Sequence, residues 1–191
     1  MMKKSLLLLA ALVLGGCATH WPESALLNPQ VIPSNQQYYS GNRITMEGVD
    51  KREAAYVFSI KKKEKAPVLV NSSQPLNSLL AEKLAEGLRS QGLEVGNSGT
   101  TNLTLAISTA AVTVEEKTFT YVTKSRVSLQ VIADFQGSKL TKQFNMSSSK
   151  EEPGEPSMAD LESTLNQQLG SVLQQIMADT ALRGYLKGQP S

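Results

Sequence analysis

Cys17 has the most distinctive chemistry in the sequence, because it is the only cysteine and directly follows a segment typical of export signals. Residues 1–4 include two lysines, and residues 5–16 form an almost unbroken apolar run. A run of about a dozen residues is too short to cross the roughly 30 Å hydrocarbon core of a membrane, which needs about 20 residues. It has the features of an export signal, and a thiolate placed directly after it is a nucleophile that can accept a lipid.

The sequence Leu14-Gly15-Gly16-Cys17 resembles the bacterial lipobox. Two small residues fit the narrow cleft of a signal peptidase, which would cleave between Gly16 and Cys17. Cys17 would then carry a diacylglycerol thioether and an N-acyl chain, and such multiple acylation makes membrane attachment effectively permanent. Ala18 resembles the outer-membrane pattern, since an Asp at that position commonly retains a lipoprotein at the inner membrane. The alternative is an ordinary exported protein in which Cys17 is only the last residue of the signal.

This motif predicts three parts: a signal peptide (residues 1–16), an acylated cysteine with a flexible tether (residues 17–41) and a periplasmic α+β domain (residues 42–191). The tether is predicted because residues 18–41 are polar, contain three prolines and show no period of 2 or 3.6. The expected location is the outer membrane, with the protein attached through its lipid and the domain in the periplasm.

Aromatic residues of the predicted tether carry separate expectations. Tyr38 and Tyr39 are expected to pack on the domain as its first anchor. Trp21 has two interpretations, because an indole favours the headgroup zone of a membrane but also occurs in solvated linkers. The sequence alone leaves both interpretations open.

A basic cluster, Lys61-Lys62-Lys63-Glu64-Lys65, lies between two predicted strands. One interpretation is a solvated hairpin tip. The other is a contact patch in which Lys61, Lys62, Lys63 and Lys65 meet membrane phosphates or an acidic partner, each exposed charge contributing modestly and losing strength with salt.

The overall charge argues against nucleic acid as a partner. The formal net charge of +2 comes from Lys3 and Lys4, which leave with the signal, and the remainder holds 17 basic and 17 acidic side chains. A balanced surface does not attract a polyanion over distance. The expected partners are therefore the membrane, through the lipid, and an unidentified periplasmic or envelope protein.

The residues needed for catalysis or metal binding are scarce. The only histidine is His20, so the predicted domain has neither histidine nor cysteine for a catalytic triad or a typical zinc site. Glu115 and Glu116 are adjacent and would point to opposite faces of a strand, while Glu151, Glu152 and Glu155 lie in a predicted loop. We therefore predict no enzyme, no catalytic residue, no metal and no cofactor other than the covalent lipid.

Hydrophobic periodicity predicts the elements that form the domain. Apolar residues at period 2 predict two long hairpins, with turns at residues 115–118 and 136–138, followed by a loop over residues 147–156. Apolar faces at period 3.6 predict a helix that ends near Gly92 and a second helix that starts at the Ser157/Asp160 capping box and ends between residues 182 and 187. Shorter strands are expected over residues 43–48, 55–60, 68–70 and 93–95. The expected fold is an α+β two-layer sandwich, a mainly antiparallel sheet with two amphipathic helices packed on one face.

The order of these features resembles the YajG family of bacterial lipoproteins. The resemblance is carried by the lipobox, the segment Asp50-Lys51-Arg52, and the segments PLNSLLAEKLAEGLRSQGLEVG, LTLAISTAAVTV, KSRVSLQVIADFQGSKLTKQF and MADLESTLNQQLGSVLQQIMADTALRGYL. It spans nearly the whole chain and implies an outer-membrane lipoprotein with an uncharacterised periplasmic domain. It supplies no catalytic residues.

Three functional hypotheses follow. The first is a non-catalytic structural or interaction module of the envelope. The second is a carboxylate-based envelope hydrolase, which would need two converging carboxylates with perturbed pKa values. The third is a carrier of an apolar ligand, which would need an internal cavity of several hundred cubic ångströms.

Overall fold

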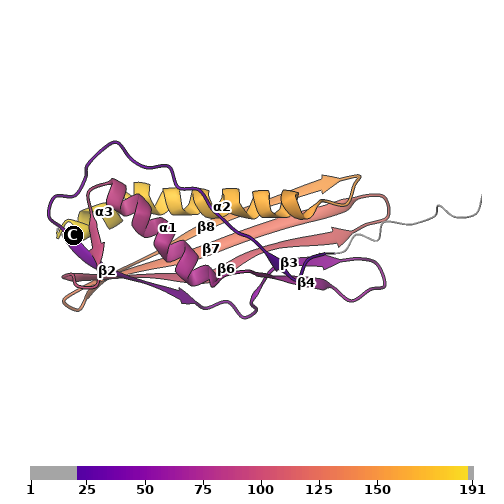
Figure 1. The fold of residues 1–191 in the computed structure, drawn as a ribbon, viewed down its shortest axis with the longest axis horizontal. Helices are drawn as coiled ribbons and strands as arrows, with labels where there is room; N and C mark the ends of the chain where they lie inside the picture. Colours follow the sequence, from indigo (N-terminus) through magenta and orange to yellow (C-terminus); the bar gives the residue numbers. More distant parts are fainter. Residues whose placement is uncertain (1–20, 189–191) are drawn as a thin grey trace, which may run out of the picture.

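The computed structural model describes residues 21–188, and its framework is a meander of three long strands. These are β6 (Thr101–Glu116), β7 (Tyr121–Phe135) and β8 (Ser138–Glu152), which pair antiparallel in that order (Figure 1). Both predicted hairpins are confirmed. The turn between β7 and β8 places Gln136 at φ 51° and Gly137 at φ 88°, the left-handed pair that a two-residue hairpin requires.

β8 is longer than predicted. The expected loop over residues 147–156 is wrong in its first part, because β8 continues to Glu152 and pairs opposite Tyr121. Its Ser-rich end has no apolar period, so this stretch is a strand because β7 offers a ladder of backbone partners.

The prediction of a mainly antiparallel sheet is only partly correct, because the three long strands pair antiparallel but four other strand pairs are parallel. β2 (Arg43–Asp50) and β3 (Tyr56–Lys61) lie end to end along one edge of β6, and both run parallel to it. β4 (Val68–Ser72) pairs antiparallel with β3, while β1 (Ser24–Ala25) joins β4 and β5 (Glu94–Gly96) joins β2 in parallel. The α+β class is confirmed, but the sheet is mixed and curled.

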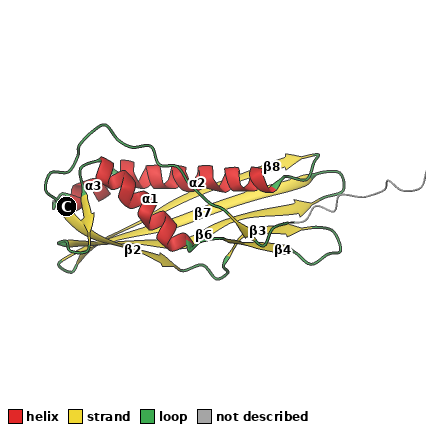
Figure 2. Ribbon diagram, in the orientation of Figure 1, coloured by secondary structure: helices red, strands yellow, loops and turns green. Residues whose placement is uncertain are grey.

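Three helices lie over the sheet where two were predicted: α1 (Leu76–Ser90), α2 (Met158–Ala178) and α3 (Thr180–Leu186) (Figure 2). The Ser157/Asp160 capping box at the start of α2 is confirmed. The predicted last helix is interrupted at Asp179, because its carboxylate accepts a hydrogen bond from the Leu182 N–H at 2.7 Å and so caps a new helix. Gly92 ends the α1 region with φ 88°, as expected of a residue after a helix.

The core lies between the helices and one face of the sheet. Apolar side chains alternate along β6 and β7, and leucines at helical spacing on α1 and α2 cover them. Residues that are at most 1% exposed in this core include Leu80, Leu84, Leu103, Leu105, Ile107, Val127, Leu129, Leu165, Leu169 and Leu173.

The prediction of a flexible tether up to residue 41 is wrong for residues 21–41, the part that the structure describes. Trp21 is only 8% exposed, and Ala25 and Leu27 are fully buried. The interpretation of Trp21 as a membrane anchor or a solvated linker residue is therefore also wrong, because its side chain belongs to the core. The prediction that Tyr38 and Tyr39 pack on the domain is confirmed, since both N–H groups donate to the Gln91 carbonyl oxygen, at 2.8 and 3.1 Å.

Between Trp21 and Tyr39 the chain crosses the helical layer as a strap, residues 26–34. Its backbone is held by a row of side chains on α2: the Leu26 N–H donates to Glu162 Oε1 at 3.0 Å, and the Asn28 N–H donates to Asn166 Oδ1 at 2.8 Å. One helical turn of α2 further on, Gly170 lies directly beneath the backbone of Gln30. The strap therefore forms part of the helical layer.

Among residues 21–188, no helix is long and apolar enough to cross a membrane.

Candidate functional site

The sequence-predicted site residues fall in two places. Gly16 and Cys17, the predicted cleavage and lipidation positions, lie outside the described residues, as does His20. The basic cluster forms the end of β3 and the loop that joins it to β4, as predicted for a segment between two strands. Its role as a contact patch remains a prediction.

The four lysines of the cluster have different surroundings. The Lys62 ammonium lies 2.8 and 2.9 Å from the two carboxylate oxygens of Glu155, and this hydrogen bond raises the pKa of Lys62. The side chains of Lys61, Lys63 and Lys65 are exposed, and none of them forms an ion pair within the described part of the chain. Lys62 thus joins the loop to the body of the protein, whereas the other three lysines remain available to an outside partner.

A different site, which the sequence did not predict, lies on the face of the sheet away from the helices. β2 pairs with β6 only as far as Ile107, and β3 pairs with β6 only from Val112 onward. Residues 108–111 of β6 therefore have no strand neighbour on that side, and a bulge between Ile107 and Thr109 bends the strand at the same point. Such a break in an otherwise continuous sheet exposes backbone groups that a partner can reach.

Three clefts meet at this break and share Thr109; we call them together the outer groove. They measure about 540, 400 and 320 Å³. The first two share Tyr56 and Ala111, and the first and third share Arg126 and Ser147. The groove therefore crosses the sheet from the loop between β2 and β3 to the outer strand β8.

Arg126 is the central charged residue of the outer groove. On β7 it is paired in register with Ala111 of β6 and Ser147 of β8, so its neighbours on both sides are small. The side chain is exposed, and within residues 21–188 it forms no ion pair and no hydrogen bond. A guanidinium with unused donors, surrounded by hydroxyl groups, is suited to carboxylates, phosphates or sugar hydroxyls.

One wall of the groove is fixed by an ion pair. Arg52 Nη2 lies 2.8 Å from Asp50 Oδ2, and the Arg52 side chain is only 8% exposed. The hydrogen bond from Arg52 is the main cause that holds the pKa of Asp50 below its usual value. Arg52 also donates to the Tyr56 carbonyl oxygen at 3.3 Å, so this pair fixes the loop that carries Tyr56 into the groove.

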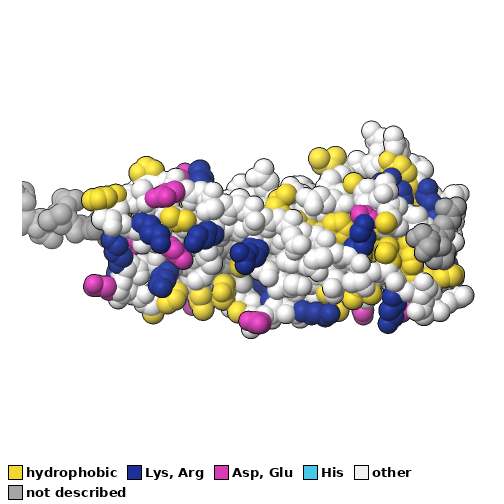
Figure 3. Space-filling view, turned by 180° about the vertical axis from the view of Figure 1, so that it is seen from behind, with side chains coloured by type: hydrophobic (Ala, Val, Ile, Leu, Met, Phe, Trp, Pro, Cys, Tyr) yellow, Lys and Arg dark blue, Asp and Glu magenta, His cyan; other side chains and the backbone are white. Residues whose placement is uncertain are grey.

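The rest of this face is largely polar and bonded within itself. Thr104 Oγ1 donates to Glu47 Oε1 at 2.9 Å, and Ser128 Oγ donates to Asn145 Oδ1 at 2.7 Å. Seen from behind, the middle of the surface is largely white, the colour of uncharged polar side chains and backbone, with separate charged groups and some hydrophobic side chains among them (Figure 3). The outer groove differs from its surroundings because the polar groups of Arg126 and Ser147 lack such bonds within the described residues.

A cleft of about 550 Å³ at the start of α2 contains the carboxylates relevant to the hydrolase hypothesis, Glu152, Glu155 and Asp160. Asp160 accepts hydrogen bonds from Ser157 Oγ and the Ser157 N–H, at 2.6 and 2.9 Å, and these bonds lower its pKa. Glu155 is paired with Lys62. A general acid needs a raised pKa, so the direction of the Asp160 shift fits a helix cap better than proton donation.

The carrier hypothesis can be compared with a cleft of about 680 Å³ between the strap and α2. Its lining is mainly amide and hydroxyl side chains: Gln30, Ser163, Asn166, Gln167, Ser171 and Gln174. The cleft also includes Ile32 and is open to solvent, so it is not the enclosed cavity that a carrier of an aliphatic chain would need. Within residues 21–188, no three or more His, Cys, Asp or Glu residues are grouped closely enough to hold a metal.

Comparison with known proteins gives a consistent family and fold. Residues 29–187 match the family model Lipoprotein_16, described as "Uncharacterized lipoprotein". The proteins named "Uncharacterized lipoprotein YajG" from Escherichia coli strains K12 and O6:H1 are each 26% identical over 190 residues, which is 98% of both chains. The crystal structure of protein XCC0632 from Xanthomonas campestris has a TM-score of 0.63 and 10% identity, covering 86% of this chain and 97% of that one. At this identity the structural likeness concerns the fold alone.

Proposed function

Since the chain belongs to the lipoprotein family Lipoprotein_16, we propose that it is an outer-membrane-anchored lipoprotein whose periplasmic domain is a non-catalytic interaction module. The anchor is Cys17, acylated after cleavage at Gly16. The site of interaction is the outer groove, and the partner is a protein or wall component of the envelope.

The observation that carries this proposal is the state of Arg126. Its guanidinium stands exposed between Ala111 and Ser147, beside a break in the sheet, and has no bonded partner within the described residues. An exposed cation of this kind favours an envelope component that offers carboxylate or phosphate groups, because paired hydrogen bonds from a guanidinium give such contacts both strength and orientation. The adjacent backbone of residues 108–111 can add hydrogen bonds to an extended chain.

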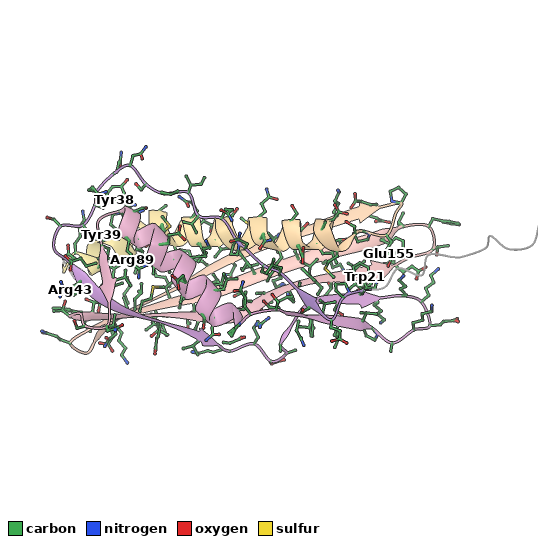
Figure 4. The ribbon with its side chains drawn as sticks, in the orientation of Figure 1. Trp21, Tyr38, Tyr39, Arg43, Arg89 and Glu155 are labelled. Carbon is green, nitrogen blue, oxygen red and sulfur yellow. The ribbon has the colours of Figure 1, made fainter. Side chains whose placement is uncertain are left out.

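The test is site-specific photo-crosslinking in cells that express the lipidated protein. A photoreactive residue at Ser147 should capture one defined partner, and Arg126→Gln should lower the yield at least fivefold. Arg43→Gln is the matched control, because Arg43 is an exposed arginine at one end of the sheet, outside the outer groove, and pairs with Glu94. Figure 4 labels Arg43 at that end.

Loss of the product in both variants, or in neither, would contradict a role for the outer groove. The lipid anchor is tested separately by mass spectrometry of the purified mature protein. Acyl chains on Cys17 are expected, and an unmodified thiol would refute the anchor.

A further inference from the structure

The link between the predicted lipid and the folded domain is very short. The described chain begins with the buried Trp21, and Cys17 precedes it by four positions. Four residues span at most about 14 Å even when fully extended. A flexible tether up to residue 41 would have let the domain move freely above the membrane, whereas a link of this length holds one part of the domain close to it.

The part held closest is one end of the sheet. β1 runs parallel to β4 with Ser24 opposite Asn71, and Trp21 precedes Ser24 by three residues, on the side from which β4 starts. β4 starts at the loop that follows β3, and the turn between β6 and β7 projects from the same end. Trp21 and Glu155 are both labelled near this end in Figure 4, while Tyr38, Tyr39 and Arg43 lie at the opposite end.

This end also exposes apolar side chains that the fold leaves uncovered. Phe119, in the turn between β6 and β7, is 87% exposed, and Leu69, on β4 close to the preceding loop, is 53% exposed. Five large apolar residues are exposed among residues 21–188, and three of them, Val68, Leu69 and Phe119, lie at this end. Exposure of a phenylalanine ring to water is unfavourable, whereas phenylalanine and leucine side chains are favourable at the boundary between headgroups and acyl chains.

Unpaired lysines surround these apolar residues. Lys61, Lys63 and Lys65 extend from the loop between β3 and β4 without ion pairs in the described structure. Of the carboxylates near this end, Glu115 is paired with Lys117 at 2.9 Å and Glu152 with Lys150 at 2.6 Å. Glu64, in the same loop as the lysines, and Glu116 and Glu151 form no ion pair in the described structure. Charges of both signs therefore remain at this end, so the lysines contribute only modestly near membrane phosphates and the apolar side chains provide most of the contact.

We propose that this end of the domain, formed by the turn at residues 117–120 and the loop at residues 62–67, rests on the surface of the bilayer that holds the lipid. Phe119 enters the headgroup layer, and Lys61, Lys63 and Lys65 lie near the phosphates. This inference rests on the anchor of the proposed function. It adds an orientation, because contact through these loops holds the long strands upright on the membrane.

An upright domain places the outer groove at a defined height. Strands of 15 residues measure about 50 Å, so the turn between β7 and β8 would stand about that far from the membrane. Arg126 is the sixth residue of β7, which begins at the turn between β6 and β7 near the membrane, so the groove would lie about 20 Å above the surface. The partner would therefore meet the protein between the membrane and the far tip.

The test uses single-cysteine variants of the lipidated protein in vesicles of phosphatidylethanolamine and phosphatidylglycerol. An environment-sensitive fluorophore at Thr118→Cys reports on the proposed contact, and the same fluorophore at Lys139→Cys reports on the opposite tip. Nitroxide carried on the lipid headgroups should quench the label at position 118 at least threefold more strongly than the label at position 139. Phe119→Ser combined with Lys63→Ser and Lys65→Ser should abolish most of this difference, while the protein stays attached through Cys17.

Equal quenching at positions 118 and 139 would overturn the proposal, as would quenching at position 118 that the triple variant leaves unchanged. The three replaced side chains are exposed, so the variant should keep the circular dichroism spectrum of the unmodified protein. Failure of the anchor is distinguishable, because a protein without acyl chains on Cys17 would not float with the vesicles at all.

Discussion

Arg126 is exposed because of the size of its neighbours. Ala111 and Ser147 flank it on the adjacent strands, and neither side chain is long enough to cover or pair with a guanidinium. Elsewhere on the same face, neighbouring side chains form hydrogen bonds with one another, as Thr104 does with Glu47. A guanidinium left open between small side chains is the feature that makes this point of the sheet suited to a polar ligand.

Asp50 should make a pH-dependent contribution to stability. Its pKa is lowered in the folded protein by Arg52, so the contribution is present above the unfolded-state pKa of about 4 and is lost as the pH falls through the folded-state pKa. Asp50→Asn should lower the free energy of unfolding by roughly 1 kcal/mol near pH 7, a modest value because Asp50 is partly open to water. Urea denaturation from pH 7 to pH 3 measures this difference, which should shrink below pH 4. A difference that stays constant over this range would show that the carboxylate charge does not contribute.

The strap shows how a helix can position a segment that has no regular structure of its own. Glu162, Asn166 and Gln174 of α2 accept hydrogen bonds from strap N–H groups, and Gly170 completes the row at the same four-residue spacing. Residues four apart lie on one side of a helix, so this row forms a straight track for the extended backbone. The strap replaces water on that side of α2 with a fixed set of backbone partners.

Gly170→Ala should loosen the strap. A Cβ at this position would overlap the carbonyl oxygen of Gln30, so the strap must move away from α2. We expect a loss of about 1–3 kcal/mol, the usual effect of overpacking, and a melting temperature lower by several degrees. Thermal unfolding followed by circular dichroism measures the change.

Gly184→Ala is the matched control for this prediction, because a Cβ at position 184 of α3 would have no atom within 4 Å. There the better helix propensity of alanine should leave stability unchanged or raise it by up to about 1 kcal/mol. Equal effects of the two substitutions would mean that the strap does not touch α2.

Elements with a strong local pattern could be predicted from the sequence, and elements defined by distant partners could not. The alternation of Leu103, Leu105 and Ile107 predicted β6, and Ser157 with Asp160 predicted the start of α2. Period 2 does not encode whether a neighbouring strand is parallel, so the pairing of β2 and β3 with β6 was missed. Because the outer groove exists only where those two strands leave β6 open, it was missed with them.

The strap was missed for a different reason. The buried residues in the strap and on either side of it, Trp21, Ala25, Leu27 and Tyr39, follow neither helical nor strand spacing and are separated by prolines and polar residues. The available signal was on the helix that holds it, where Glu162, Asn166 and Gln174 lie in one row beside the apolar face. The basic cluster, in contrast, was located correctly from the sequence because it interrupts two apolar strands.

At the scale of the whole molecule, the beginning of the folded domain determines how the protein can be arranged at a membrane. A domain that began at residue 42 would move on a chain of about 24 residues and could take any orientation. A domain that begins at Trp21 has one end within about 14 Å of Cys17. The position of the strap therefore links the packing of α2 to the height at which the outer groove meets a partner.

The most direct test of this account is hydrogen exchange of residues 21–41 in the mature lipidated protein, measured by mass spectrometry on short peptides. The amides of Leu26, Asn28, Tyr38 and Tyr39 all donate hydrogen bonds within the fold, so they should exchange far more slowly than those of an unstructured chain. Exchange of residues 21–41 at the rate of an unstructured peptide would contradict the account, because the domain would then hang from a long tether.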